Sequence, residues 1–184
     1  MTGYVEPPRA GTEAETLIGS LERQRATFAF KCEGLTAEQL RHRIGSSEVT
    51  IGGLLKHLAH MEDLNVTHTL AGHDMPAVWR AMPEDDPGAF AWSSAADDSP
   101  DELYALWADA VERSRGVVLD AVRTIGPGGT FEVRPGVEVS VRRQLVDLIE
   151  EYARHTGHAD LIREDVDGRV GEDPPGERRP FTLP

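Results

Sequence analysis

The chain reads VRRQLVDLIEEYARHTGHADLIRE over residues 141–164, and this stretch decides the fold that we expect. Successive residues of an α-helix are about 100° apart, so residues of one face recur every three or four positions. One such stripe comprises Val141, Leu145, Leu148, Tyr152, His155, Ala159 and Ile162. The stretch therefore predicts a long amphipathic helix, with His155 at a core-facing position where a leucine is expected.

Glu151 lies one turn before His155, on the same flank of this helix. Side chains four residues apart on a helix are close enough to bind the same ion or ligand. A carboxylate and an imidazole so placed can share a divalent metal, as two histidines do in other helical metal sites. The alternative is a hydrogen-bonded core histidine with a solvated glutamate beside it, and a metal site would need a third ligand.

A third candidate ligand is present in a second amphipathic stretch, IGGLLKHLAHMEDLNVTHT, at residues 51–69. Its apolar face comprises Ile51, Leu54, Leu55 and Leu58. His57 lies at the boundary of that face and can point inward, whereas His60 lies opposite its centre and is expected to be solvated. The candidate metal ligands are therefore His57, Glu151 and His155.

The composition limits the classes of protein to which the chain can belong. Its 184 residues predict one domain with tails. The net charge of -13 and a pI near 4.9 argue against nucleic acid and anionic membranes as partners, since both attract clustered Lys and Arg. No apolar run of membrane-spanning length and no signal sequence is present, so we expect a soluble, cytoplasmic protein.

Cys32 is the only cysteine in the chain. A single cysteine excludes an intrachain disulfide and any zinc site built from several cysteines. Because Cys32 lies on an apolar helix stripe, we expect a buried, unreactive thiol rather than a nucleophile.

Side-chain caps and apolar periodicity predict four long helices. The caps are Thr12, Thr50, Ser99 and Ser140. The helices are expected at residues 12–33, at 51–69, from Pro100 to about residue 125, and from residue 141 onward, with one short turn at residues 36–40. Four amphipathic helices and almost no strand predict an all-α fold, a four-helix bundle.

The segments between the helices are also distinctive. Residues 71–100 lack periodicity but contain several aromatic side chains, which favours a packed cover over the bundle end. FEVRPGVEV, at residues 131–139, alternates around Pro-Gly and predicts a small hairpin or an extended crossover. The expected organisation is an extended lead-in at residues 1–11, the bundle at 12–168, and a Pro/Gly/Arg-rich tail at 169–184. The tail is peripheral or packs on a neighbouring subunit.

Arg25 lies in the middle of the apolar stripe of the first helix. A guanidinium at such a position must extend to solvent or find an anionic partner inside. That partner is either a carboxylate of the protein or the carboxylate of a ligand, and the sequence leaves both possibilities open.

Three segments together resemble the DinB/YfiT-like superfamily, specifically its actinobacterial branch related to the Streptomyces mini-circle protein. They are LIEEYARHTGHADLIRE, GGLLKHLAHME and EGLTAEQLRHR, and the likeness spans residues 14–168. The resemblance implies a four-helix bundle with a divalent metal, commonly zinc or nickel. It also implies that His57 and the pair Glu151 and His155 bind this metal. His158, one turn beyond His155, is the alternate ligand or a residue that supports the ligands.

Many members of the superfamily have histidine at both positions of the last-helix pair. With Glu151 at the first, this chain looks more like the mycothiol-dependent isomerase-type relatives. The resemblance thus implies a metal-dependent transferase that uses a low-molecular-weight thiol, such as mycothiol, and a small electrophile. Arg25, Trp79 and Trp92 are candidates for substrate binding.

Two other classes of function remain open on the sequence. A metal-activated water would make the protein a hydrolase or a maleylpyruvate-type isomerase. The protein could also be a non-catalytic metal- or ligand-binding stress protein. The superfamily and the wide apolar arc of the third helix lead us to expect a homodimer.

Overall fold

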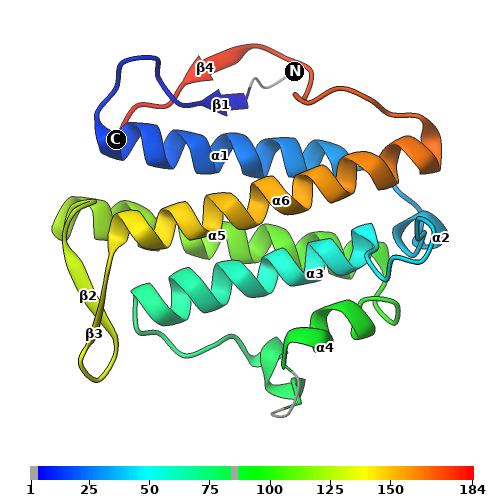
Figure 1. Cartoon of the computed structure of the whole chain (residues 1–184), viewed down its shortest axis with the longest axis horizontal. Helices are drawn as coiled ribbons and strands as arrows, with labels where there is room; N and C mark the ends of the chain where they lie inside the picture. The colour runs from blue at the N-terminus through cyan, green and yellow to red at the C-terminus, as the bar shows by residue number, and fades with distance from the viewer. Residues whose placement is uncertain (1–3, 84–86) are drawn as a thin grey trace.

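The computed structural model describes residues 4–83 and 87–184, and it is mostly helical (Figure 1). The long helices are α1 (Glu13–Cys32), α3 (Ile51–Glu62), α5 (Pro100–Thr124) and α6 (Val141–Asp167). Helix α1 packs on α6, and α3 packs on both α5 and α6. The expected all-α class is confirmed.

The helices begin where the sequence predicted their caps. Thr12 and Ser99 form capping boxes, in which the cap side chain and a glutamate three residues later bond to each other's backbone amide. Thr50 and Ser140 accept a hydrogen bond from the backbone N–H three residues on. The short helix α2 (Ala37–Leu40) also begins with a capping box.

The second long helix differs from the expected uniform helix over residues 51–69. At Asp63 the chain changes from α- to π-helical geometry, and this segment, η1, runs over Asp63–Leu70. The change coincides with the fully buried Asp63 carboxylate, which accepts hydrogen bonds from Arg113 and from the indole N–H of Trp79. A π-helical segment of eight residues is unusual, since π-helix is rare and occurs mostly as single turns inside α-helices.

The segment between η1 and α5 packs along α3, instead of over the end of the helices as predicted (Figure 1). It contains a short 3-10 helix, η2 (Ala77–Ala81), and the helix α4 (Pro87–Ser94). Trp79 is buried against Ala59 of α3 and Ala110 of α5. We call residues 75–83 and 89–98 the cover.

The remaining elements are two small pairs of strands. Strands β2 (Thr130–Arg134) and β3 (Val137–Ser140) form the predicted hairpin between α5 and α6. Strand β1 (Tyr4–Glu6) pairs in parallel with β4 (Arg178–Pro180), so the tail returns to the first helix of its own chain (Figure 1). Of the expected lead-in, residues 1–3 lie outside the described part of the chain.

The core lies between the four long helices. Its fully buried side chains include Leu21, Phe28, Ile51, Leu54, Leu55, Leu58, Leu145, Leu148 and Tyr152. Each large apolar side chain removed from water stabilises the fold by roughly 1.5–3 kcal/mol. Within the described residues, no helix combines the length and the apolar character needed to cross a bilayer.

Candidate metal centre

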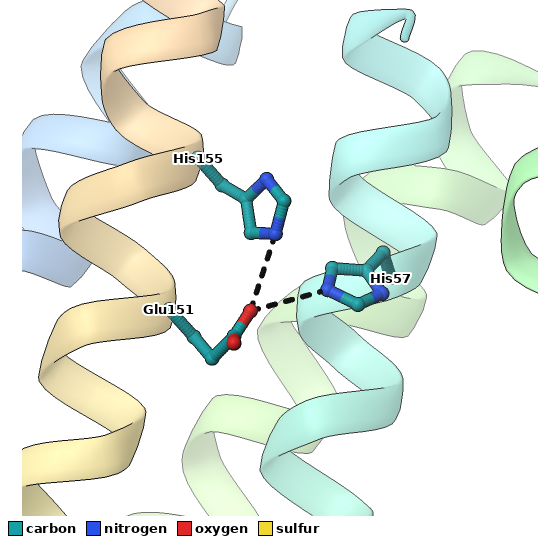
Figure 2. Close-up of side chains that lie close together, drawn as sticks. All are labelled: His57, Glu151 and His155. Carbon is teal, nitrogen blue, oxygen red and sulfur yellow. Dashed lines mark hydrogen bonds and ion pairs between the residues drawn. The ribbon is translucent and has the colours of Figure 1, made fainter. Parts of the chain in front are cut away.

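His57 of α3 faces Glu151 and His155 of α6, as Figure 2 shows. The Glu151 Oε2 atom lies 3.2 Å from His155 Nε2 and 3.5 Å from His57 Nε2. One potential ligand atom from each residue lies within 4.8 Å of the other two. Ligand atoms about 2 Å from a common zinc ion are roughly 3–4 Å apart, so the three side chains fit a metal with little rearrangement.

The secondary structure explains why these side chains converge. Glu151 and His155 are four residues apart on α6 and therefore share one flank of that helix. His57 occupies the boundary of the apolar face of α3, and α3 packs directly on α6. His155 is 7 % exposed, whereas the Glu151 side chain is 32 % exposed, so the cluster is closed on one side and open to solvent at the glutamate.

The electrostatic environment favours neutral imidazoles. Burial lowers the pKa of His57 below its usual value. Burial, followed by repulsion from His57, lowers the pKa of His155 to about 4. A histidine must be neutral to offer a lone pair to a metal, so both rings are in the form that ligates at neutral pH. Two imidazoles and a carboxylate form a donor set known from catalytic zinc sites.

His158 contacts His155 from the side away from Glu151. The Nδ1 atoms of the two rings are 3.2 Å apart, within hydrogen-bond distance, and His158 is exposed. Ligand histidines commonly bond through their second ring nitrogen to a group that fixes the ring orientation. The geometry of His158 thus suits a supporting role better than that of an alternate ligand.

Of the three substrate-binding candidates, the structure brings one to the cluster. The Trp92 indole stacks on the His57 ring, with centroids 4.7 Å apart and planes inclined by 22°. It also lies 5.7 Å from the His155 ring. Trp92 belongs to α4 and forms an aromatic wall of the candidate site.

Arg25 and Trp79 lie elsewhere. The Arg25 guanidinium is buried and forms two hydrogen bonds with the Glu62 carboxylate, of 2.7 and 2.6 Å. The anionic partner of Arg25 is therefore a carboxylate of the protein itself and not that of a ligand. Trp79 donates to Asp63 at 2.8 Å and packs against His60.

The expectation of a solvated His60 was wrong, because this residue is only 7 % exposed. The cover packs over the face of α3 that lies opposite the core, and the Trp79 ring is 4.9 Å from the His60 ring. The periodicity of one helix does not reveal a second layer on its polar side.

Sequence reasoning also missed the importance of Glu62, which is fully buried. A signal was available: Glu62 lies four residues after Leu58, on the apolar stripe, as Arg25 lies on the stripe of α1. Two opposite charges on the core faces of different helices suggest an internal ion pair.

A mainly helical chain with a two-histidine, one-carboxylate cluster between facing helices falls in the class of candidate helical metalloproteins. The family model for mycothiol-S-transferase matches residues 16–168. The chain therefore belongs to this DinB-like family, as the three resembling segments predicted. A comparison with curated proteins gives no significant match.

Proposed function

We propose that the protein is a metal-dependent S-transferase that joins a low-molecular-weight thiol, such as mycothiol, to a small electrophile. The observation that carries the proposal is the cluster of His57, Glu151 and His155 in a member of the mycothiol-S-transferase family. Family membership supports the thiol and the transfer chemistry. The cluster supports the dependence on one divalent metal per chain, with zinc or nickel as the expected ion.

His57, Glu151 and His155 would hold that ion and leave at least one position open to a substrate. When bound, the metal would lower the pKa of a thiol ligand, which makes the nucleophilic thiolate available near neutral pH. The solvent-exposed edge of Glu151 marks the side from which substrates reach the cluster. Trp92 offers them a flat apolar surface beside His57.

The burial of Cys32 indicates that the reacting thiol belongs to a cosubstrate and not to the protein. Cys32 is buried, and burial raises its pKa well above the ordinary value. It lies on α1, whereas the candidate metal ligands lie on α3 and α6. The nucleophilic sulfur must therefore come from a separate molecule.

We further infer that the four long helices form the DinB-like bundle and that the protein acts in the cytoplasm, where low-molecular-weight thiols are kept reduced. A homodimer remains our prediction for its assembly. Light scattering at micromolar concentration should give twice the mass of the 20.2 kDa chain. The mass of a single chain would contradict a dimer.

The proposed function is tested with purified protein, mycothiol and an aryl halide, in which a carbon–sulfur bond forms and halide leaves. Thiol consumption should saturate with both substrates and should require stoichiometric zinc or nickel, measured by elemental analysis. His155→Ala should lose both the metal and the activity. Cys32→Ser should keep both, because the buried thiol has no role in transfer.

Other outcomes of this experiment point to the alternative classes. Full metal occupancy without thiol transfer, but with turnover of an ester or of maleylpyruvate, would indicate a hydrolase or an isomerase. Occupancy with no turnover over a broad panel would indicate a binding protein. Unchanged metal content in His155→Ala would refute the assignment of the metal centre.

A further inference from the structure

The cover is fixed to one face of α3. Gly53, Lys56 and His57 lie at helical spacings of three and four residues and share this face. The Lys56 ammonium is 2.5 Å from the Asp98 carboxylate and 5.2 Å from the centre of the Phe90 ring. Lys56 is only 5 % exposed, and its contacts with Phe90 and Asp98 hold the cover against α3.

The Trp92 indole packs closely against Gly53 of α3. A Cβ atom at this position would lie 2.9 Å from Cε3 of the Trp92 indole, which is closer than real Cβ contacts. It would also lie 3.1 Å from Oγ1 of Thr50, the cap residue of α3. Trp92 can therefore occupy its observed position only if residue 53 lacks a side chain.

Helix propensity does not account for this glycine, since glycine inside a helix is less stable than alanine. Gly116 of α5 shows the contrast, because a Cβ atom there would meet nothing within 4 Å. Gly53 thus differs from Gly116 in that a side chain there would collide with a neighbour, and that neighbour is the Trp92 indole.

The position of Trp92 matters for His57. The Nδ1 atom of His155 is within hydrogen-bond distance of His158, which can orient that ring. Among the described residues, the His57 ring contacts Glu151, His155 and the stacked Trp92 indole. Glu151 and His155 are themselves candidate ligands, so the stack is the contact outside the cluster that fixes the plane of the His57 ring.

We propose that Gly53 is a positioning residue of the candidate metal centre. By leaving room for Trp92 against α3, it sets the orientation of the His57 imidazole. This makes α4 and the cover part of the centre, although they contribute no ligand. The proposal rests on the proposed function and adds a residue to the same site.

The test compares Gly53→Ala, Trp92→Ala and the double variant with the unchanged protein. Zinc affinity, measured by calorimetric titration, should fall about tenfold in each single variant, as is typical when the support of a ligand is removed. The double variant should be no weaker than Trp92→Ala, because both changes remove the same stack. Full affinity in Gly53→Ala would overturn the proposal. Losses that multiply in the double variant would also overturn it and would assign the effect to the Thr50 cap.

A second readout needs no metal. The Trp92 indole should shield the His57 ring protons, so their NMR signals in the metal-free protein should move downfield in Gly53→Ala and in Trp92→Ala. Gly116→Ala is the matched control and should leave both the signals and the zinc affinity unchanged. Unmoved His57 signals in Gly53→Ala would contradict the positioning role. If the unchanged protein binds neither zinc nor nickel, the proposed function fails, and the NMR signals still decide whether Gly53 orients the His57 ring.

Discussion

At the scale of single residues, the two histidines of the last helix differ in burial and in direction. His155 is buried and directs Nε2 at Glu151, while His158 is exposed and contacts the Nδ1 atom of His155. Only one of them faces the position where a metal would be shared with His57. We expect His158, on the adjacent turn of the helix, to support the His155 ring through its contact with Nδ1.

Alanine variants should separate these two roles. His155→Ala removes one of three expected ligands and should abolish metal retention. His158→Ala removes only the support of a ligand, which typically costs roughly 10- to 100-fold in metal affinity. Calorimetric titration measures the metal affinity of both variants. If His158→Ala lost more affinity than His155→Ala, the ligand would be His158 and our assignment to the turn of His155 would be wrong.

The buried histidines should also make the stability of the metal-free protein depend on pH. Burial lowers the pKa of His57 and His60, and the pKa of His155 falls to about 4. A histidine with a lowered pKa in the folded state takes up protons first in the unfolded state, at about pH 6.5. The free energy of unfolding should therefore be highest above pH 6.5 and fall as the pH is lowered toward 4.

Urea titrations between pH 4 and 8, in the presence of a chelator, measure this dependence. His155→Gln removes one of the titrating groups and should flatten the decline between pH 6.5 and 4. Parallel curves for the variant and the unchanged protein would show that His155 does not titrate as its burial requires.

At the scale of elements, local capping determines where the helices begin. At the start of α5, Ser99 Oγ accepts a hydrogen bond from the Glu102 backbone N–H, and the Glu102 carboxylate accepts one from the Ser99 N–H at 2.8 Å. Pro100 follows the cap, where its missing N–H has no helical partner to lose. The cap thus ends the cover and starts a 25-residue helix.

Ser99→Ala should destabilise the protein by about 1 kcal/mol, because the cap hydrogen bond to the Glu102 amide is lost. Ser46→Ala, in an exposed loop, is the control and should change stability by less than about 0.5 kcal/mol. Urea unfolding compares the two variants. Equal stabilities would mean that packing alone determines the start of α5.

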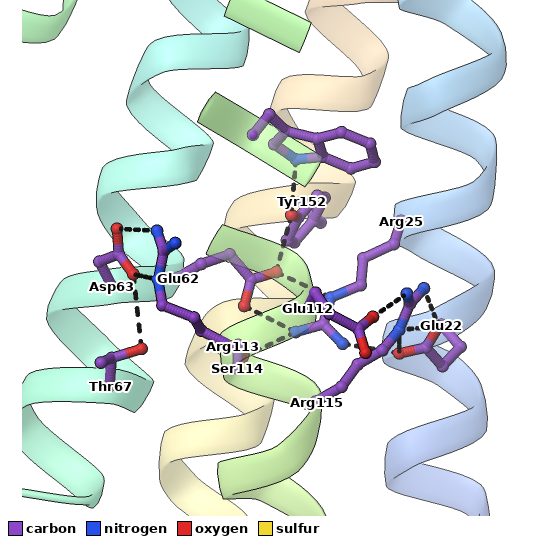
Figure 3. A network of polar contacts seen from close by, with 11 residues as sticks. Glu22, Arg25, Glu62, Asp63, Thr67, Glu112, Arg113, Ser114, Arg115 and Tyr152 are labelled. Carbon is purple, nitrogen blue, oxygen red and sulfur yellow. Dashed lines mark hydrogen bonds and ion pairs between the residues drawn. The ribbon is translucent and has the colours of Figure 1, made fainter. Parts of the chain in front are cut away.

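At the scale of the whole molecule, one buried polar network joins all four long helices (Figure 3). Arg25 of α1 bonds to Glu62 of α3 and, at 2.9 Å, to Ser114 of α5. The hydroxyl group of Tyr152 on α6 donates to the same Glu62 carboxylate at 2.7 Å. Tyr152 directly follows Glu151, so the network also fixes how α6 lies against α3 beside the candidate metal centre.

Arg25→Ala should cost about 3–5 kcal/mol of stability, because it leaves the fully buried Glu62 carboxylate without its counter-charge. Arg143→Ala is the control; it breaks an exposed pair with Asp147 and should cost no more than about 1 kcal/mol. Chemical denaturation measures both. The double variant Arg25→Met, Glu62→Leu should recover much of the loss, since it leaves no unpaired charge. A loss in the double variant as large as in Arg25→Ala would contradict this account.

The sequence by itself determined the four long helices and their caps, and it offered the hairpin as one of two possibilities. These features depend on local chemistry, in which an apolar stripe or a cap residue acts on neighbours within one or two turns. The phases of the second and last helices also predicted His155 at a core-facing position, Glu151 on the same flank, and His57 at a boundary from which it can point inward. The structure brings these three side chains together as those phases require.

Only the tertiary structure decided what lies against the other faces. His60 is buried because the cover packs on α3, and the Arg25 guanidinium is occupied because Glu62 approaches from another helix. Trp92 reaches His57, whereas Trp79 bonds to Asp63 at the start of the π-helical segment. Periodicity reports the apolar side of one helix, but the partner of a polar or aromatic side chain comes from a distant segment. That partner is fixed by the packing of whole elements, which no local pattern encodes.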